Sequence, residues 1–161
     1  QKVPRYRAFL DASLDERWVV PEPEELLRFL LCSFQDRFPL VVDDLLALPE
    51  KSMIVAEGFG FTPEILSPVL SSEHQAVWLV PSEAFKRASM ERRNKPSFRD
   101  RVGDPQRATR NVFLRDMLLA ERVREQAQSR GLLVYEVDGT RSVEEMATLI
   151  ERPFEPCLRR K

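Results

Sequence analysis

The stretch Gln75-Ala76-Val77-Trp78-Leu79-Val80, closed by Pro81, decides the fold class of this chain. It is a short continuous apolar run of strand length with β-branched residues, which is typical of a strand buried on both faces of a parallel sheet. Ser82 follows directly and is a residue that caps helix starts, so we expect a helix from Glu83 to about Arg93. A strand that passes straight into a helix indicates the α/β class.

Two further runs have the same character as the first. Met53-Ile54-Val55-Ala56 ends in Glu57 and Leu132-Leu133-Val134-Tyr135-Glu136-Val137 leads into Asp138, so we expect two more strands there. Helices are predicted between and around the strands, over 24–48 with a kink or restart at Pro39, from Pro63 to near Pro68, over 106–130 with Gly131 as its stop, and over 143–152 before Pro153. Alternating strands and helices predict a three-layer α/β/α architecture with a parallel sheet.

The size and composition fit one folded domain. With 161 residues, 43% hydrophobic and 32% charged, we expect a single α/β domain over 1–158 and a disordered tail at 159–161. The longest apolar runs fall far short of the ~20 residues that a membrane span needs, so we expect a cytoplasmic protein with no membrane partner. Two cysteines and one histidine cannot form a zinc site or a disulfide framework, and we expect no bound structural metal.

Basic charge is concentrated in one stretch of an otherwise nearly neutral chain. Residues 86–130 hold 13 Lys or Arg against 6 Asp or Glu, although the whole chain has a net charge of −1. Solvated helices of mixed charge would explain this surplus, and so would a site for phosphate, because the guanidinium group of arginine binds phosphoryl oxygens with two parallel hydrogen bonds. Asn94–Asp104 is predicted to be a mobile loop between two helices, and an arginine-bearing loop of this kind can act as a closing lid.

Carboxylates follow two of the expected strands, at the edge where open parallel sheets bind ligands. Glu57-Gly58 could hold a metal-bound water or a substrate hydroxyl, or Glu57 could simply accept neighbouring backbone N–H groups. Asp138-Gly139 is also the dipeptide of a common turn, so a purely structural role remains the alternative there.

The order of these parts resembles a P-loop kinase of the adenylate and shikimate kinase type, and more closely the uncharacterised bacterial kinase-like ATPases. The resemblance covers nearly the whole chain, but each motif is short. The segments that carry it are Asp15-Glu16-Arg17-Trp18, Phe38-Pro39-Leu40, Val55-Ala56-Glu57-Gly58, Trp78-Leu79-Val80-Pro81 and Val137-Asp138-Gly139-Thr140-Arg141-Ser142-Val143-Glu144-Glu145.

This resemblance implies a role for each part of the chain. Residues 5–48 would be the helical acceptor-binding region, residues 86–115 an arginine-rich lid, and ATP with Mg²⁺ the cofactor. The catalytic residues would be Glu57, Arg92, Arg93, Arg99 and Arg115, and the cofactor-binding residues would be Gly58, Asn111, Asp138, Gly139, Thr140 and Arg141.

The chain departs from the family at its central motif. It has five glycines, no Gly-Lys dipeptide and no glycine-rich phosphate loop. Since the chain also begins with Gln1, we expect that the family's N-terminal strand, loop and helix are absent and that this piece alone does not transfer phosphate. The missing strand would lie mid-sheet, between Met53–Glu57 and Gln75–Val80. We therefore expect the two strands to close up, or an upstream segment or a second chain to complete the sheet.

Three functions follow from these observations. The first is a partial small-molecule or nucleotide kinase-like ATPase that binds a phosphorylated ligand through the arginine-rich lid. The second is a non-catalytic domain of the same fold that binds a nucleotide, a phosphate group or a protein. RNA binding is the weakest of the three, because Phe98 is the main aromatic side chain in the basic stretch that could stack on a base.

Overall fold

The computed structural model describes residues 4–49, 54–93 and 97–158, and the expectations for Met53, Asn94–Pro96 and the tail 159–161 lie outside them. The chain divides into two compact units. The first unit consists of Gln1–Ile65 and Pro96–Leu118, and the second of Leu66–Lys95 and Leu119–Lys161. Each unit is described by itself below.

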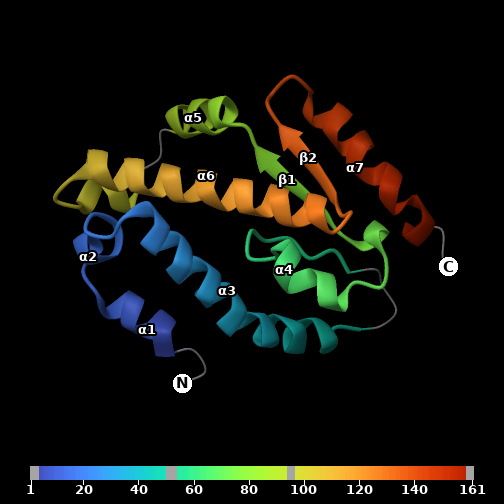
Figure 1. Ribbon diagram of the computed structural model, residues 1–161, viewed down its shortest axis with the longest axis horizontal. Coiled ribbons are helices and arrows are strands. Elements are labelled where there is room, and N and C mark those ends of the chain that lie inside the picture. The colour runs from blue at the N-terminus through green and yellow to red at the C-terminus, as the bar shows by residue number, and fades with distance from the viewer. Residues whose placement is uncertain (1–3, 50–53, 94–96, 159–161) are drawn as a thin grey trace. The chain divides into compact units, whose positions relative to one another are not determined.

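The first unit is helical in its described residues. It contains α1 (Pro4–Asp11), α2 (Leu14–Trp18), α3 (Pro23–Leu46), α4 (Pro63–Leu66), the 3-10 helix η3 (Phe98–Arg101) and the beginning of α6 (Pro105–Ser129), and Figure 1 labels the α-helices.

Local capping signals explain where these helices begin. The Ser13 hydroxyl accepts a hydrogen bond from the Glu16 N–H at 3.2 Å, and the Glu16 carboxylate accepts one from the Ser13 N–H at 2.8 Å, which starts α2. In α3, Pro23 occupies the first turn, where a missing N–H does no harm. The predicted helix over 24–48 is confirmed, and it continues through Pro39 without a restart.

The second unit contains the sheet of the described chain. Strand β1 (Val77–Pro81) pairs in parallel with β2 (Leu133–Val137), and both arrows point the same way in Figure 1. The unit also holds the 3-10 helices η1 (Ser67–Val69) and η2 (Glu73–Gln75), together with α5 (Glu83–Arg92), the end of α6 and α7 (Val143–Leu158).

Both strands and their connecting helices match the sequence prediction closely. The Ser82 hydroxyl accepts a hydrogen bond from the Phe85 N–H and caps α5, and Gly131 ends α6 with a φ of +67°. In β1 the side chains alternate, because Trp78 and Val80 are buried but Leu79 is 46% exposed. Burial of β1 on both faces was therefore a wrong expectation.

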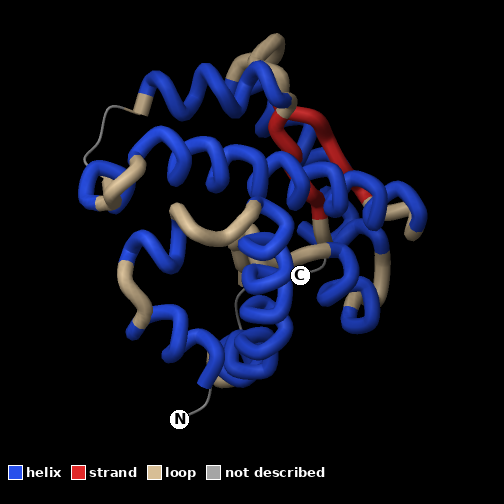
Figure 2. The backbone as a smooth tube through the Cα atoms, turned by 60° about the vertical axis from the view of Figure 1, so that its left-hand side comes forward, coloured by secondary structure: helices blue, strands red, loops and turns tan. Residues whose placement is uncertain are grey.

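The expected strand Met53–Glu57 is not formed over its described part. Residues Ile54–Glu57 have no regular secondary structure, and Val55 is 82% exposed. The physical reason is that a strand exists only when a neighbouring strand takes up its backbone hydrogen bonds, and no other described segment pairs with this one. Within the described residues the sheet has two strands, and Figure 2 shows helices making up most of the chain. The architecture is thus α/β in class.

Two smaller predictions also need correction. The last helix was expected to end before Pro153, but α7 continues to Leu158, because a proline removes one backbone donor without preventing the helix from resuming. The described part of the expected loop contains a 3-10 helix, since Ser97 caps η3 by accepting a hydrogen bond from the Arg99 N–H at 3.1 Å.

Candidate functional site

The carboxyl ends of β1 and β2 lie next to each other in the second unit. Pro81 stands opposite Val137 in the parallel register, and the Ser82 N–H donates to the Val137 carbonyl at 3.0 Å. The turn into α5 and the loop after β2 therefore lie at one edge of the sheet, which is where open parallel sheets bind their ligands.

The loop after β2 is a tight turn held by its own side chains. The Asp138 Oδ1 atom accepts hydrogen bonds from the Thr140 N–H at 2.9 Å and from the Thr140 hydroxyl at 2.7 Å. These bonds, the backbone one first, hold the pKa of Asp138 below its usual value. Gly139 has a φ of +85°, and a Cβ there would lie 3.0 Å from Cδ2 of Phe85. The loop therefore requires glycine, and it exposes Thr140 and Arg141.

Two of the predicted arginines lie at the end of α5 in the same unit. Arg92 is its last residue, and Arg93 follows as the cap, with its backbone N–H donating to the Ser89 carbonyl at 3.2 Å. Both side chains are exposed, and neither has a partner among the described residues. Within the described residues, no side chain competes with an anion for these two guanidinium groups.

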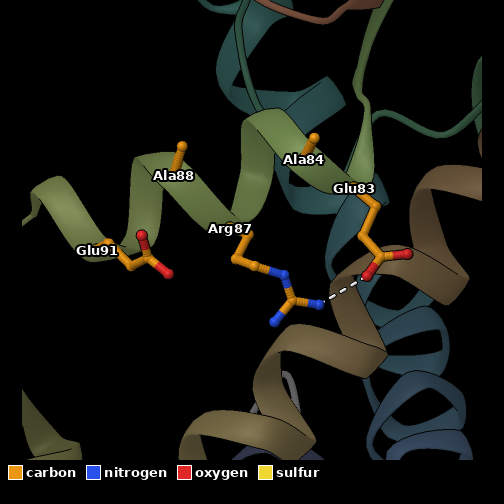
Figure 3. A pocket seen from close by; sticks show the side chains of 5 residues that line it. All are labelled: Glu83, Ala84, Arg87, Ala88 and Glu91. Carbon is orange, nitrogen blue, oxygen red and sulfur yellow. Dashed lines mark hydrogen bonds and ion pairs between the residues drawn. The ribbon is translucent and has the colours of Figure 1, made fainter.

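A shallow hollow runs along α5 and is lined by Glu83, Ala84, Arg87, Ala88 and Glu91. Figure 3 shows the Arg87 guanidinium turned toward Glu83, and its Nη2 atom donates to Glu83 Oε1 at 2.7 Å. All five residues come from one helix face, and none of them was predicted as a site residue.

The other two predicted arginines lie in the first unit and are bonded to neighbours. The Arg99 Nε atom donates to the Ser97 hydroxyl at 3.0 Å. Arg115 donates to Asp116 Oδ1 from both Nε, at 3.0 Å, and Nη2, at 2.6 Å, and its Cζ atom lies 5.6 Å from the centre of a Trp18 ring. Because its side chain is only 13% exposed, Arg115 is already committed to Asp116 and Trp18.

Contacts with the α2 region anchor this arginine-bearing segment. The ring of Phe98 stacks on Trp18 with centroids 4.5 Å apart, and the Gly103 N–H donates to Asp15 Oδ1 at 2.8 Å. Sequence reasoning missed this anchor because it joins residues that are far apart in the chain. The one local signal was the capping box at the start of α2, which indicates that Trp18 belongs to an ordered helix.

Asn111 has a structural position within the same unit. It is 4% exposed, and its Nδ2 atom lies 3.3, 3.3 and 3.0 Å from the carbonyl oxygens of Trp18, Val19 and Pro21. The carboxamide thus satisfies carbonyl groups that the end of α2 leaves without partners.

Glu57 and Gly58 lie in the exposed segment before α4. Glu57 is exposed and has no partner among the described residues, and because no strand forms there it does not stand at a strand end. A Cβ on Gly58 would meet only the Phe61 ring, at 3.6 Å. The strand-end geometry on which the metal or acceptor role of Glu57 depended is therefore not present.

The predicted site residues divide between the two units. The second unit holds Arg92, Arg93, Asp138, Gly139, Thr140 and Arg141, and the first unit holds Glu57, Gly58, Arg99, Asn111 and Arg115. Across 4–49, 54–93 and 97–158, no three or more His, Cys, Asp or Glu side chains are grouped so that they could hold one metal ion.

Comparisons with known proteins place the chain in no established family. No protein-family model matches it, and neither the curated proteins nor the solved structures include a significant match. None of the described helices combines the length and apolarity needed to cross a membrane.

Proposed function

We propose that this chain is the α/β body of a P-loop kinase-like ATPase that binds a phosphorylated ligand. The observation that carries the proposal is the parallel pairing of β1 with β2, since it brings the Ser82 turn and the Asp138–Arg141 loop to one sheet edge. Ligands of open parallel sheets bind at this edge, and the resemblance described above assigns the residues of the loop after β2 to cofactor binding.

Arginine would supply the contacts to phosphate. Arg92 ends α5 and Arg93 caps it, and neither has a partner among the described residues, so their binding to a phosphoryl group would break no ion pair of the described chain. Bidentate guanidinium–phosphate bonds are short and charge-assisted, which suits a nucleoside diphosphate or a phosphorylated small molecule.

Binding without transfer is the expected behaviour of these 161 residues. They contain no glycine-rich loop and lysine to hold the β- and γ-phosphates in line. The described acidic residues also do not fit a Mg²⁺ site, because Asp138 is bonded to Thr140 and Glu57 stands apart from any strand end. We therefore assign no step to ATP-bound Mg²⁺.

A non-catalytic domain of the same fold is the second candidate function. It is favoured by the fixed position of Asp138, whose carboxylate orders its own loop and keeps a lowered pKa. A carboxylate in that state is a poor general base, whereas the loop and the free arginines would still bind a nucleotide, a phosphate group or an acidic protein segment.

Calorimetric titration of the full chain with ADP, pyrophosphate and adenosine at low salt tests the proposal. We expect ADP and pyrophosphate to bind and the double variant Arg92→Gln/Arg93→Gln to weaken both by about tenfold or more. The matched control Arg28→Gln/Arg130→Gln removes the same charge at other exposed positions and should change binding by less than about threefold. Equal losses in both double variants, or no binding of ADP to the unmodified chain, would contradict the proposal.

A further inference from the structure

A second cavity lies in the first unit, where α3 and α6 begin. It has a volume of about 570 Å³, and its lining includes Pro23, Glu24, Arg110 and Leu114. It is a groove open to solvent, since Glu24 and Arg110 are both exposed. None of these four residues belongs to the phosphate site proposed above.

Two of the charges in this cavity are already neutralised by each other. The Arg107 Nη2 atom donates to Glu22 Oε1 at 2.8 Å, which ties the start of α6 to the start of α3. Asp104 is also engaged, because its Oδ1 atom accepts a hydrogen bond from the Arg107 N–H at 2.9 Å.

The other two charges, those of Glu24 and Arg110, are unpaired within the described residues. Glu24 and Arg110 both line the cavity, and neither forms a hydrogen bond or ion pair with any residue in the described part of the chain. One carboxylate and one guanidinium group are therefore available to a ligand in the same cavity, beside the partly exposed side chain of Leu114.

This pair of free charges selects the ligand class. A purely anionic ligand would meet the carboxylates of Glu22, Glu24 and Asp104, and a purely cationic one would meet two guanidinium groups. A molecule with one ammonium and one carboxylate group avoids both repulsions and pairs with Glu24 and Arg110. We infer that this cavity is a binding site for a small zwitterion of the amino-acid type. The inference goes beyond the proposed phosphate binding and does not depend on it.

A ligand series tests the inference on the full chain. Glycine, β-alanine, 4-aminobutyrate and 6-aminohexanoate increase the distance between the two charges stepwise, and butyrate and butylamine each keep one charge. We expect at least one zwitterion to bind, by NMR titration, about tenfold more tightly than both singly charged compounds. The inference is overturned if no zwitterion binds below about 10 mM, or if butyrate or butylamine binds as tightly as the best zwitterion.

Variants then locate the site. Glu24→Gln and Arg110→Gln should each weaken the best zwitterion by about fivefold or more, and Arg28→Gln, on the same helix as Glu24, should not. In the charge swap Glu24→Arg/Arg110→Glu the ligand can bind in reverse, so affinity should recover relative to the single variants. Binding that is unchanged in both Gln variants would overturn the inference, provided that their circular dichroism matches that of the unmodified chain. The ADP titration of Arg92→Gln/Arg93→Gln reports on the other site alone, so the two proposals fail separately.

Discussion

Arg107 and Arg115 of the first unit differ from Arg92 and Arg93 of the second in how far their charges are already used. In the first unit, Arg107 is paired with Glu22 and Arg115 with Asp116, and Phe98 is stacked on Trp18. In the second unit, Arg92 and Arg93 have no partner among the described residues. A charge surplus counted along the sequence therefore overestimates what a ligand can use, because part of it holds the fold together.

The largest expected effect comes from removing the centre of the anchor. Trp18→Ala deletes the stacked contact with Phe98, the edge contact with Phe9 and the ring beneath Arg115. We expect the free energy of unfolding to fall by about 3 kcal/mol in urea denaturation. Val55→Ala is the control, because Val55 is 82% exposed, and a similar loss in both variants would mean that the anchor is not special.

Asn111 of α6 donates to carbonyl groups at and after Trp18, so removal of its carboxamide tests the same anchor. Asn111→Ala leaves the partly buried carbonyl groups of Trp18, Val19 and Pro21 without their shared donor, so we expect a loss of about 2 kcal/mol. The control Gln128→Ala changes an exposed residue of the same helix and should lose less than about 0.5 kcal/mol. An Asn111→Ala variant as stable as the control would show that these contacts contribute little.

A glycine substitution addresses the second unit. Gly139→Ala forces a side chain onto a backbone with a φ of +85° and toward Phe85, so we expect a loss of about 1–2 kcal/mol together with weaker ADP binding. Gly58→Ala is the control, since its Cβ would meet nothing closer than 3.6 Å. If ADP affinity is unchanged in Gly139→Ala, the loop after β2 does not border the ligand.

The smallest effect is a pH dependence that both units share. Hydrogen bonds from the Ser13 hydroxyl and then its N–H lower the pKa of Glu16, and those from Thr140 lower the pKa of Asp138. A carboxyl group with a lowered pKa in the folded state adds stability above its unfolded pKa, and this stability is lost as pH falls through the folded value. Urea midpoints should therefore decrease on acidification, and Glu16→Gln should reduce that decrease. An identical pH profile in the variant would contradict the assigned role of Glu16.

Two exposed apolar residues, one in each unit, bear on whether the sheet is complete. The sheet of the described chain has two strands, and Leu79 of β1 and Val55 before α4 are both largely exposed. We propose that another segment or a second chain adds a strand, because two strands are seldom stable alone. Light scattering should then show that the chain associates, and the association should be weaker in Leu79→Lys. A chain that stays monomeric at about 100 µM and unfolds cooperatively above about 65 °C would contradict this proposal.

Sequence alone predicted the parts of the fold that depend on local signals. The caps at Ser82 and Ser142 and the stop at Gly131 lie within a few residues of the helix ends that they define, so their positions were readable. The run at Ile54–Glu57 was misleading because strand formation depends on a partner strand, which no local pattern encodes. The position of the Asp138–Arg141 loop could also be predicted from a local signal, the apolar strand directly before it.

The anchor and the second cavity could not be predicted from sequence. Trp18 meets Phe98 of η3, and Glu22 at the start of α3 meets Arg107 of α6, only because these segments, distant in sequence, lie together in the folded unit. Such contacts between distant residues also decide which charges are free. Arg110 and Arg107 look equivalent in the sequence, yet one is available and the other is paired.

Residue-resolved NMR of the labelled full chain during an ADP titration tests the central proposal most directly. The account predicts saturable shifts of the backbone amides of Arg92, Arg93 and Asp138–Arg141, with amides of the exposed control positions Arg28 and Arg130 unchanged. Shifts confined to residues outside this set, or no saturable shift up to about 10 mM ADP, would contradict it.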